Sequence, residues 1–315
     1  MSVAADGPLA DMLATRPATG RVAQAVLDVW PEHAKYLERS FAGRMPEVMD
    51  ITEVLAEAAL ILAGDRLAQI AAHYRWTCDR LREEEIFFHR NGRYRLSTFA
   101  EANAEVYDNA AYMEKYVDGL LLTQVLWANH AASCAFYFRE TPRHLPPGAR
   151  MLEVGPGHGL MVYLAMREFG LEGATAWDLS AVSVEQTRHA LALLGVTEAT
   201  LGVRDIMEIV PGGKTYDLVV LSEILEHLED PKAALRAIRP LVGRGGLVFV
   251  NVPVNSPSPD HLYLMESVDD ARALLTDTGF DIVAEDAFAT QNRPLEKALR
   301  QRISVSVCML ARPAD

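Results

Sequence analysis

A strand-like segment that runs directly into a glycine-rich turn, and then into an amphipathic segment, constrains this fold most. Residues 150–154 (RMLEV) are typical of a short buried strand, residues 155–159 (GPGHG) form the turn, and residues 160–169 have helical apolar spacing. Glycines let the backbone approach a ligand closely, and a helix N-terminus offers free N–H groups. The arrangement therefore predicts the nucleotide-binding start of an α/β domain.

The turn favours a nucleoside with a cationic tail over a dinucleotide. Its pattern is G-x-G-x-G, and Leu160 occupies the last glycine position of the dinucleotide fingerprint. Glu153 stands two residues before the first glycine, where a carboxylate would repel a pyrophosphate and attract an ammonium group. Both features argue against an NAD-dependent dehydrogenase, which is kept as an alternative enzyme.

Further apolar runs alternate with amphipathic stretches and continue the α/β pattern. The second predicted strand, residues 174–178, ends at Asp178, which could accept hydrogen bonds from ribose hydroxyls. The third, residues 199–203, leads to Asp205, which could accept from the amine of adenine. The remaining predicted strands are residues 216–221, 247–252, 280–283 and 303–310. The last contains a Ser/Val alternation that suits an edge or antiparallel strand.

Prolines and a glycine within residues 141–149 (TPRHLPPGA) predict a boundary between a helical domain, 1–145, and a ligand-binding domain, 146–315. In the first domain, Asn91-Gly92 stands between β-prone runs and predicts a two-stranded hairpin over residues 86–96. Helices followed by such a hairpin are typical of a winged helix. That module binds DNA in some proteins and forms a dimer contact or a lid in others.

Charge and composition narrow the classes of partner. Thirty Lys and Arg against 43 Asp and Glu give a net charge of −13, which argues against binding to nucleic acid or to anionic membranes. Three widely spaced cysteines favour a reducing compartment over a disulfide framework. With no long apolar run and no signal-peptide pattern, we expect a cytoplasmic protein.

Several ordered motifs resemble the class I S-adenosylmethionine (AdoMet)-dependent methyltransferases across about residues 148–312. These motifs are LEVGPGHG, WDLS, RDI, SEILEHLEDP and GRGGLVFVNVP. SEILEH is most similar to the branch of ubiquinone-pathway O-methyltransferases. The helical half resembles the winged-helix dimerisation domain of O-methyltransferases from secondary metabolism. The resemblance implies a Rossmann-like seven-stranded sheet with helices on both faces and an antiparallel last strand, AdoMet as cofactor, and a homodimer.

The resemblance also implies which residues bind AdoMet. The methionine end would contact the first turn, the ribose and adenine would contact the ends of the next two strands, and the sulfonium would lie beside the end of the fourth. The residues concerned are Glu153, Gly155, Pro156, Gly157, Asp178, Leu179, Asp205, Ile206, Ser222 and Glu223.

The acceptor site is predicted from aromatic and histidine side chains. Tyr112 and Tyr116 are four residues apart in a helical stretch, 107–138, that we expect either to tie the domains together or to cover the sulfonium with aromatic rings. An oxygen acceptor often needs a base, and a histidine can serve at neutral pH. The catalytic candidates are His227, His261 and Tyr116, and the substrate-binding candidates are Tyr112, Tyr116, His130 and His261.

The segment after the fourth predicted strand contains a pattern that is linked to metal binding in the ubiquinone branch. In the ubiquinone branch, Glu-x-x-Glu-His contributes to a metal site, and Glu223, Glu226 and His227 have that spacing. We interpret the segment as a solvated acidic loop and predict no metal.

The function predicted from these features is methyl transfer from AdoMet to a small metabolite, in secondary metabolism. Whether oxygen, nitrogen or carbon is alkylated stays open. Two alternatives remain, an enzyme that uses AdoMet for intramolecular alkylation and a non-catalytic, AdoMet-sensing winged-helix regulator.

Overall fold

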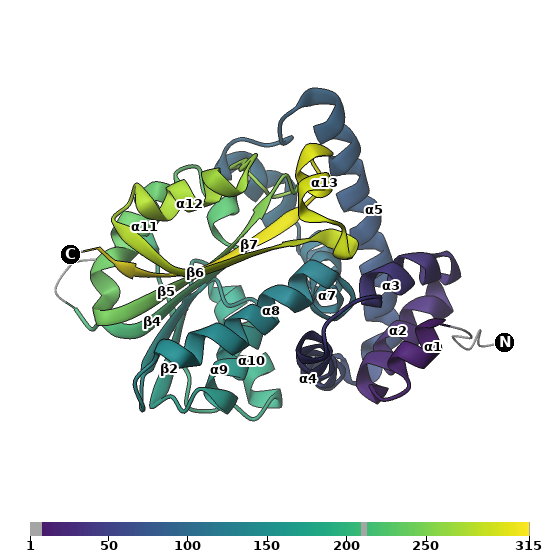
Figure 1. Cartoon of the computed structure of the whole chain (residues 1–315), viewed down its shortest axis with the longest axis horizontal. Helices are drawn as coiled ribbons and strands as arrows, with labels where there is room; N and C mark the ends of the chain where they lie inside the picture. The colour runs from purple at the N-terminus through teal and green to yellow at the C-terminus, as the bar shows by residue number, and fades with distance from the viewer. Residues whose placement is uncertain (1–7, 209–212, 315) are drawn as a thin grey trace. The chain divides into compact units, whose positions relative to one another are not determined.

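The computed structural model describes residues 8–208 and 213–314, and the chain forms two compact units (Figure 1). The first unit comprises residues 1–135, 255–262 and 288–306, and the second comprises residues 136–254, 263–287 and 307–315. The domain boundary that we predicted between residues 145 and 146 stays a prediction. The compact units differ from it because two later segments of the chain pack with the helical first unit.

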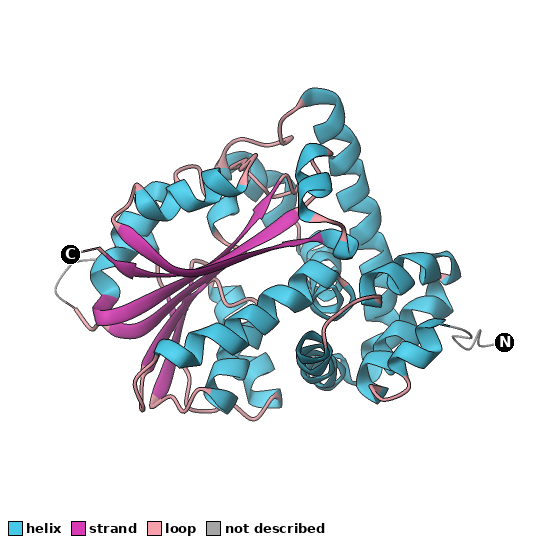
Figure 2. Ribbon diagram, in the orientation of Figure 1, coloured by secondary structure: helices cyan, strands magenta, loops and turns pink. Residues whose placement is uncertain are grey.

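A seven-stranded sheet forms the second unit, with the strand order β3-β2-β1-β4-β5-β7-β6 (Figure 2). The strands are β1 Arg150–Val154, β2 Gly173–Asp178, β3 Thr200–Val203, β4 Tyr216–Ser222, β5 Val242–Val254, β6 Phe280–Ala289 and β7 Val305–Pro313. β1 pairs in parallel with β2 and with β4, β2 with β3, and β4 with β5. The side chains of β1 and β4 are largely buried, as expected for parallel strands covered on both faces.

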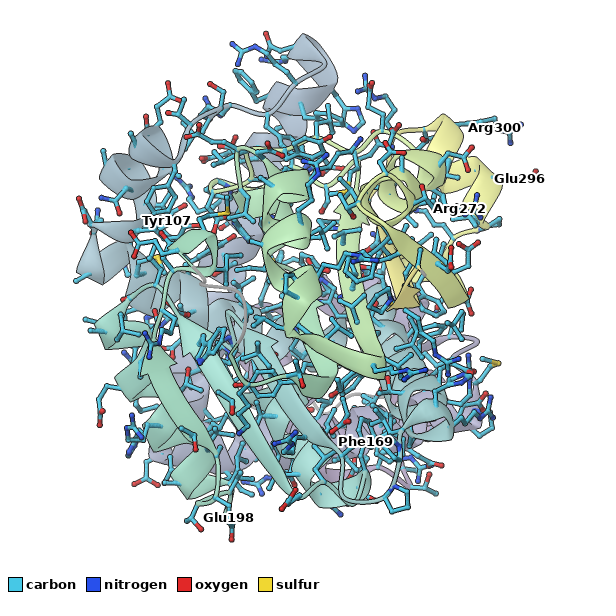
Figure 3. The ribbon with its side chains drawn as sticks, turned by 90° about the vertical axis from the view of Figure 1, so that its left-hand side faces the viewer. Tyr107, Phe169, Glu198, Arg272, Glu296 and Arg300 are labelled. Carbon is cyan, nitrogen blue, oxygen red and sulfur yellow. The ribbon has the colours of Figure 1, made fainter. Side chains whose placement is uncertain are left out.

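Helices cover both faces of this sheet. α9 (Leu160–Glu168) and α10 (Ala181–Leu193) lie on one face, and α11 (Pro231–Ile238) and α12 (Val268–Thr276) lie on the other (Figure 2). Arg272 of α12, labelled in Figure 3, bonds Glu285 of β6 through Nε at 2.8 Å and so ties helix to strand. The predicted Rossmann-like architecture is confirmed.

The last strand is antiparallel to its neighbour, as predicted, but it is not an edge strand. The Thr290 N–H donates to the Ser304 carbonyl at one end, and the Ala314 N–H donates to the Gly279 carbonyl at the other. β7 is inserted between β5 and β6, and residues 305–311 are all buried. The Ser/Val alternation suggested an exposed edge. Ser306 is buried instead, and its hydroxyl accepts a hydrogen bond from the Asn129 amide at 2.9 Å in place of water.

The first unit is helical, as predicted. Its helices are α1 Pro8–Leu13, α2 Pro17–Val29, α3 Ala34–Phe41, α4 Pro46–Ala63, α5 Leu67–Asn91, α6 Phe99–Ala102, α7 Ala110–Leu126 and α13 Leu295–Arg300. α8, Ala128–Glu140, begins in this unit, and a π-helical turn, Asn103–Tyr107, precedes α7. The helical stretch predicted over residues 107–138 is therefore two helices, interrupted at Trp127. No helix among the described residues has both the length and the apolar character needed to cross a bilayer.

The predicted hairpin over residues 86–96 is wrong, and with it the winged helix. α5 continues to Asn91, and Gly92 ends it in the left-handed conformation (φ 71°), where its N–H donates to the Phe88 carbonyl at 2.7 Å. Asn-Gly is also a helix stop, since glycine is the usual residue at that position and His89 and Arg90 complement the helix dipole. Phe88 is fully buried on the helix, so its β-prone character reflects the core.

The two interpretations of Asn91-Gly92 predict different mutational effects. A type I′ hairpin needs positive φ at both residues, whereas the helix stop needs it only at Gly92. We expect Gly92→Ala to lower the free energy of unfolding by about 1 kcal/mol, and Asn91→Ala to change it by less than about 0.5 kcal/mol. Chemical denaturation measures both, and equal losses would favour the hairpin.

Candidate active site

The carboxyl ends of β1, β2 and β4 meet at one edge of the sheet, where most of the predicted cofactor residues lie. Val154, the last residue of β1, is in register with Trp177 of β2 and with Leu221 of β4. The glycine turn begins with Gly155, whose N–H donates to the Trp177 carbonyl at 2.8 Å. The turn is thereby fixed against the second strand.

The three glycines of the turn have positive φ, but they serve different purposes. A Cβ on Gly155 would lie 2.6 Å from Cδ1 of Ile224, and one on Gly159 would lie 2.8 Å from Cδ2 of Leu191. These two glycines permit close packing within the protein. A Cβ on Gly157 would meet nothing within 4 Å. The space beside the backbone at Gly157 is therefore open.

Glu153 is a buried carboxyl group beneath this turn. It is 2 % exposed, and burial raises its pKa well above the ordinary value, although the Val162 N–H donates to it. No donor among the described residues reaches its Oε2 atom. A buried oxygen without a donor is costly, so a ligand that brings an N–H or a positive charge would stabilise it.

Asp178 is the last residue of β2, and Asp205 follows the end of β3 by two residues, as the sequence predicted. Asp178 Oδ1 accepts from the Ser180 N–H, and Asp205 Oδ1 accepts from the Met207 N–H, each at 2.8 Å. Burial raises the pKa of Asp178, which is partly shielded at the end of β2. The next residue, Leu179, is 56 % exposed, and Ile206 is buried. Exposed Leu179 is available to contact the apolar side of a bound nucleoside.

The segment after β4 is not the solvated acidic loop that we predicted. Glu226 is 0 % exposed, and Glu223 is partly buried beside it, because Leu225 and Glu226 turn inward in a short 3-10 turn, Leu225–His227. Burial raises the pKa of Glu223 to about 7, while hydrogen bonds with Glu226 and Asn251 lower it. Acidic composition alone did not reveal this burial, but the apolar Ile224 and Leu225 between the two glutamates were a signal for it.

The candidate histidines lie in different surroundings. His227 belongs to the second unit, and its Nε2 lies 3.8 Å from Glu226 Oε1. His261 belongs to the first unit, where its Nδ1 lies 2.7 Å from the Ser256 carbonyl oxygen. A carbonyl only accepts, so Nδ1 carries the proton and Nε2 is the basic nitrogen of neutral His261. Burial lowers the pKa of His130 to about 4, so His130 is neutral at pH 7.

Tyr116 has a partner set that the sequence did not reveal. Its hydroxyl donates to Asp260 Oδ1 at 2.8 Å and lies 2.5 Å from Ser258 Oγ, all within the first unit. Tyr107, labelled in Figure 3, donates to Asp260 Oδ2 at 3.3 Å. We call Tyr107, Tyr116, Ser258 and Asp260 the tyrosine clasp. It holds residues 255–262, and the missed signal was the acid in the proline-rich SPSPD run.

The clasp argues against Tyr116 as a general base, and our expectation that Tyr116 is catalytic in another way stays a prediction. Burial and the charge of Asp260 raise the pKa of Tyr116 well above its ordinary value, so the phenol keeps its proton and is not a base. Tyr112 and Tyr116 do share a helical face, with ring centroids 6.0 Å apart. That these rings cover the sulfonium stays a prediction, as does substrate binding by Tyr112, Tyr116, His130 and His261.

A family model described as "Methyltransferase domain" matches residues 127–291, just over half of the chain. This chain belongs to that family. The predicted methyltransferase family and its cofactor, AdoMet, are thereby confirmed. The open space at Gly157, the donor-free oxygen of Glu153 and the carboxylate at the end of β2 fit the three parts of AdoMet that approach a backbone, an ammonium group and a ribose.

Two curated relatives of this methyltransferase are both named ubiquinone biosynthesis O-methyltransferase. The protein from Xanthomonas campestris is 37% identical over 114 residues, which is 36% of this chain and 46% of the relative. The protein from Neisseria meningitidis is 30% identical over 125 residues, which is 39% of this chain and 51% of the relative. The chain thus spans about half the length of the curated relatives it matches.

Among solved structures, the [4+2]-cyclase SpnF covers 58% of this chain and 80% of its own, at 15% identity and a TM-score of 0.48. Similarity at this level does not support any inference about activity.

The metal site implied by the ubiquinone branch can be tested against these side chains. Two carboxylates and an imidazole, from Glu223, Glu226 and His227, are a donor set that suits a divalent cation. The burial of Glu226 fits such a site better than a solvated loop does. A cation held there would polarise an acceptor oxygen. Our expectation of no metal stays a prediction.

The role of Gly157 can be separated from backbone strain by a matched control. Gly157 and Gly195 both have positive φ, and a Cβ on either would meet nothing within 4 Å. Alanine at either position should therefore cost similar stability, about 1 kcal/mol. We expect only Gly157→Ala to weaken AdoMet binding, by at least about tenfold, because its methyl group would occupy ligand space. Calorimetry measures both affinities, and equal effects would remove Gly157 from the site.

Proposed function

We propose that this methyltransferase transfers the methyl group of AdoMet to an oxygen atom of a small molecule. The observation that carries the proposal is the edge of the sheet at which Glu153, Gly157 and Asp178 offer a buried acceptor, open space and a strand-end carboxylate. The names of the curated relatives support oxygen as the acceptor atom. Which pathway the product serves stays a prediction, since the secondary-metabolism assignment relied on the wing.

Catalysis by these residues would consist largely of positioning. AdoMet supplies a methyl group on an already activated leaving group. The protein's contribution is to hold the acceptor oxygen in line with that methyl group and to exclude water. Asp178 would accept from the ribose hydroxyls, Asp205 from the adenine amine, and Glu153 would bind the ammonium group.

An oxygen acceptor must also lose its proton, and a histidine is the side chain suited to take it at neutral pH. We propose His227, which lies in the same unit as the AdoMet residues. His261 is the second candidate, because its hydrogen bond to the Ser256 carbonyl makes Nε2 its basic nitrogen. Tyr116 holds residues 255–262 and contributes no base.

The two alternative functions fare differently. The winged-helix regulator loses its main support, because residues 86–96 contain the end of a helix and no strand. Intramolecular alkylation uses the same cofactor site and is distinguished by its product, since it releases methylthioadenosine, whereas methyl transfer releases S-adenosylhomocysteine. We also propose a cytoplasmic location, because the sequence has only three cysteines and they are far apart, which suits a reducing compartment.

The decisive experiment is mass spectrometry of the purified protein and of its reaction products. We expect AdoMet or S-adenosylhomocysteine to copurify, and a small molecule with an acceptor hydroxyl to gain one methyl group with S-adenosylhomocysteine as co-product. Asp178→Ala should weaken AdoMet binding by at least about tenfold, because a hydrogen bond to a charged group contributes about 1.5–3 kcal/mol. The control is Asp281→Ala, which removes an exposed acid on β6. Bound NAD, or methylthioadenosine as the product, would contradict the proposal.

A homodimer formed through residues 1–100 is part of the proposal. This region exposes the large apolar side chains of Met45, Ile61, Ile86 and Phe99, which a second copy of the chain could cover. We expect light scattering at micromolar concentration to give twice the mass of the 34.7 kDa chain. A monomer at that concentration would show that these side chains face solvent.

A further inference from the structure

Glu223 lies at the same sheet edge, and none of the catalytic steps proposed above uses it. It follows the last residue of β4 directly and has a left-handed backbone (φ 53°), which is uncommon for a residue other than glycine. Its Oε1 atom is buried, and no donor in the described part of the chain reaches it. A strained backbone and a buried, donor-free oxygen would both be costly without a ligand.

The backbone of Glu223 is held firmly in this conformation. Its N–H donates to the Asn251 carbonyl at 2.9 Å, which extends the pairing of β4 with β5 by one residue. The Asn251 side chain donates to Ser222 Oγ at 3.4 Å, and Cys308 Sγ lies 3.5 Å from Asn251 Oδ1. These contacts come from β4, β5 and β7, so the backbone of Glu223 is attached to a part of the sheet in which three strands are bonded together.

The topology places Glu223 near the sulfonium of AdoMet. If Asp178 at the end of β2 holds the ribose and Asp205 after β3 holds the adenine, the 5′ side of the nucleoside points towards β1 and β4. Neighbouring strands are about 4.8 Å apart, and the sulfur is one carbon beyond the ribose ring. Ile224 already packs on Gly155, so the end of β4 contacts the glycine turn within the second unit.

A second carboxyl group at the same edge independently indicates a cationic ligand. Glu153 is 2 % exposed and also has an oxygen without a donor. It lies on β1, in register with Val220, three residues before Glu223 along β4. AdoMet carries two positive charges, on its ammonium group and on its sulfur. Glu153 and Glu223 each have an oxygen without a donor that could face one of these two charges.

We propose that Glu223 recognises the sulfonium charge and makes the site favour AdoMet over S-adenosylhomocysteine. The inference rests on the proposed function and adds a specificity role to it. Methyl transfer converts the sulfonium to a neutral thioether, so the attraction to Glu223 disappears when the reaction is complete. The same carboxyl group would therefore favour binding of the methyl donor and release of the demethylated product.

The test compares the dissociation constants of three ligands by calorimetry. AdoMet is charged at the sulfur position, S-adenosylhomocysteine is neutral, and sinefungin carries an amine there. In Glu223→Gln we expect AdoMet and sinefungin to bind about tenfold more weakly and S-adenosylhomocysteine to change less than about twofold. Glu229→Gln removes an exposed acid from the same segment and should leave all three affinities unchanged.

A second variant protects the test against misfolding. Glycine tolerates the left-handed conformation, so Glu223→Gly removes the carboxyl group while relieving backbone strain. It should fold at least as stably as the parent and show the same loss of preference for charged ligands. Equal weakening of all three ligands in both variants, or no weakening, would overturn the inference.

Two further outcomes are distinguishable. If a chelator abolishes the parent's preference and added magnesium restores it, the carboxyl groups hold a metal ion, and direct recognition of the sulfonium is wrong. If the folded parent binds neither AdoMet nor S-adenosylhomocysteine, the proposed function itself fails, whatever the variants show.

Discussion

The parallel pairing of β1 with β2 on one side and with β4 on the other is the constraint on which the site depends. It brings the ends of three strands to one edge, so the glycine turn, Asp178 and Glu223 lie at the same edge although they are far apart in sequence. The Gly155 N–H closes this arrangement by bonding to the second strand. Substitutions that shift the β1 register would therefore disturb every part of the proposed cofactor site together.

Local sequence patterns predicted the sheet-containing half of the chain well, because each strand, turn and helix follows the last directly in sequence. Each strand of the sheet was located from its apolar run, and the acids Asp178 and Asp205 from their places at strand ends. The helical half shows where such reasoning fails. Asn91-Gly92 has two physical uses, and only the length of α5 and the burial of Phe88 decide between them. Those facts depend on tertiary packing, which no local pattern contains.

The acidic segment after β4 and the tyrosine clasp were missed for a related reason. Burial of Glu226 depends on how the 3-10 turn directs its side chain, and the partners of Asp260 lie some 150 residues earlier in the chain. An acidic composition predicts that carboxyl groups lie on the surface, but Glu226 and Asp260 are buried.

The clasp has a consequence for the organisation of the polypeptide. The chain leaves the sheet after Val254, packs eight residues with the helical unit, and returns at Tyr263, whose N–H bonds to the Glu226 carbonyl. No single cut separates the two units. A shortened protein that began at residue 136 would keep Asp260 but lose both tyrosine hydroxyls that bind it. Exchange of the helical half alone would leave residues 255–262 and 288–306 without the helices with which they pack.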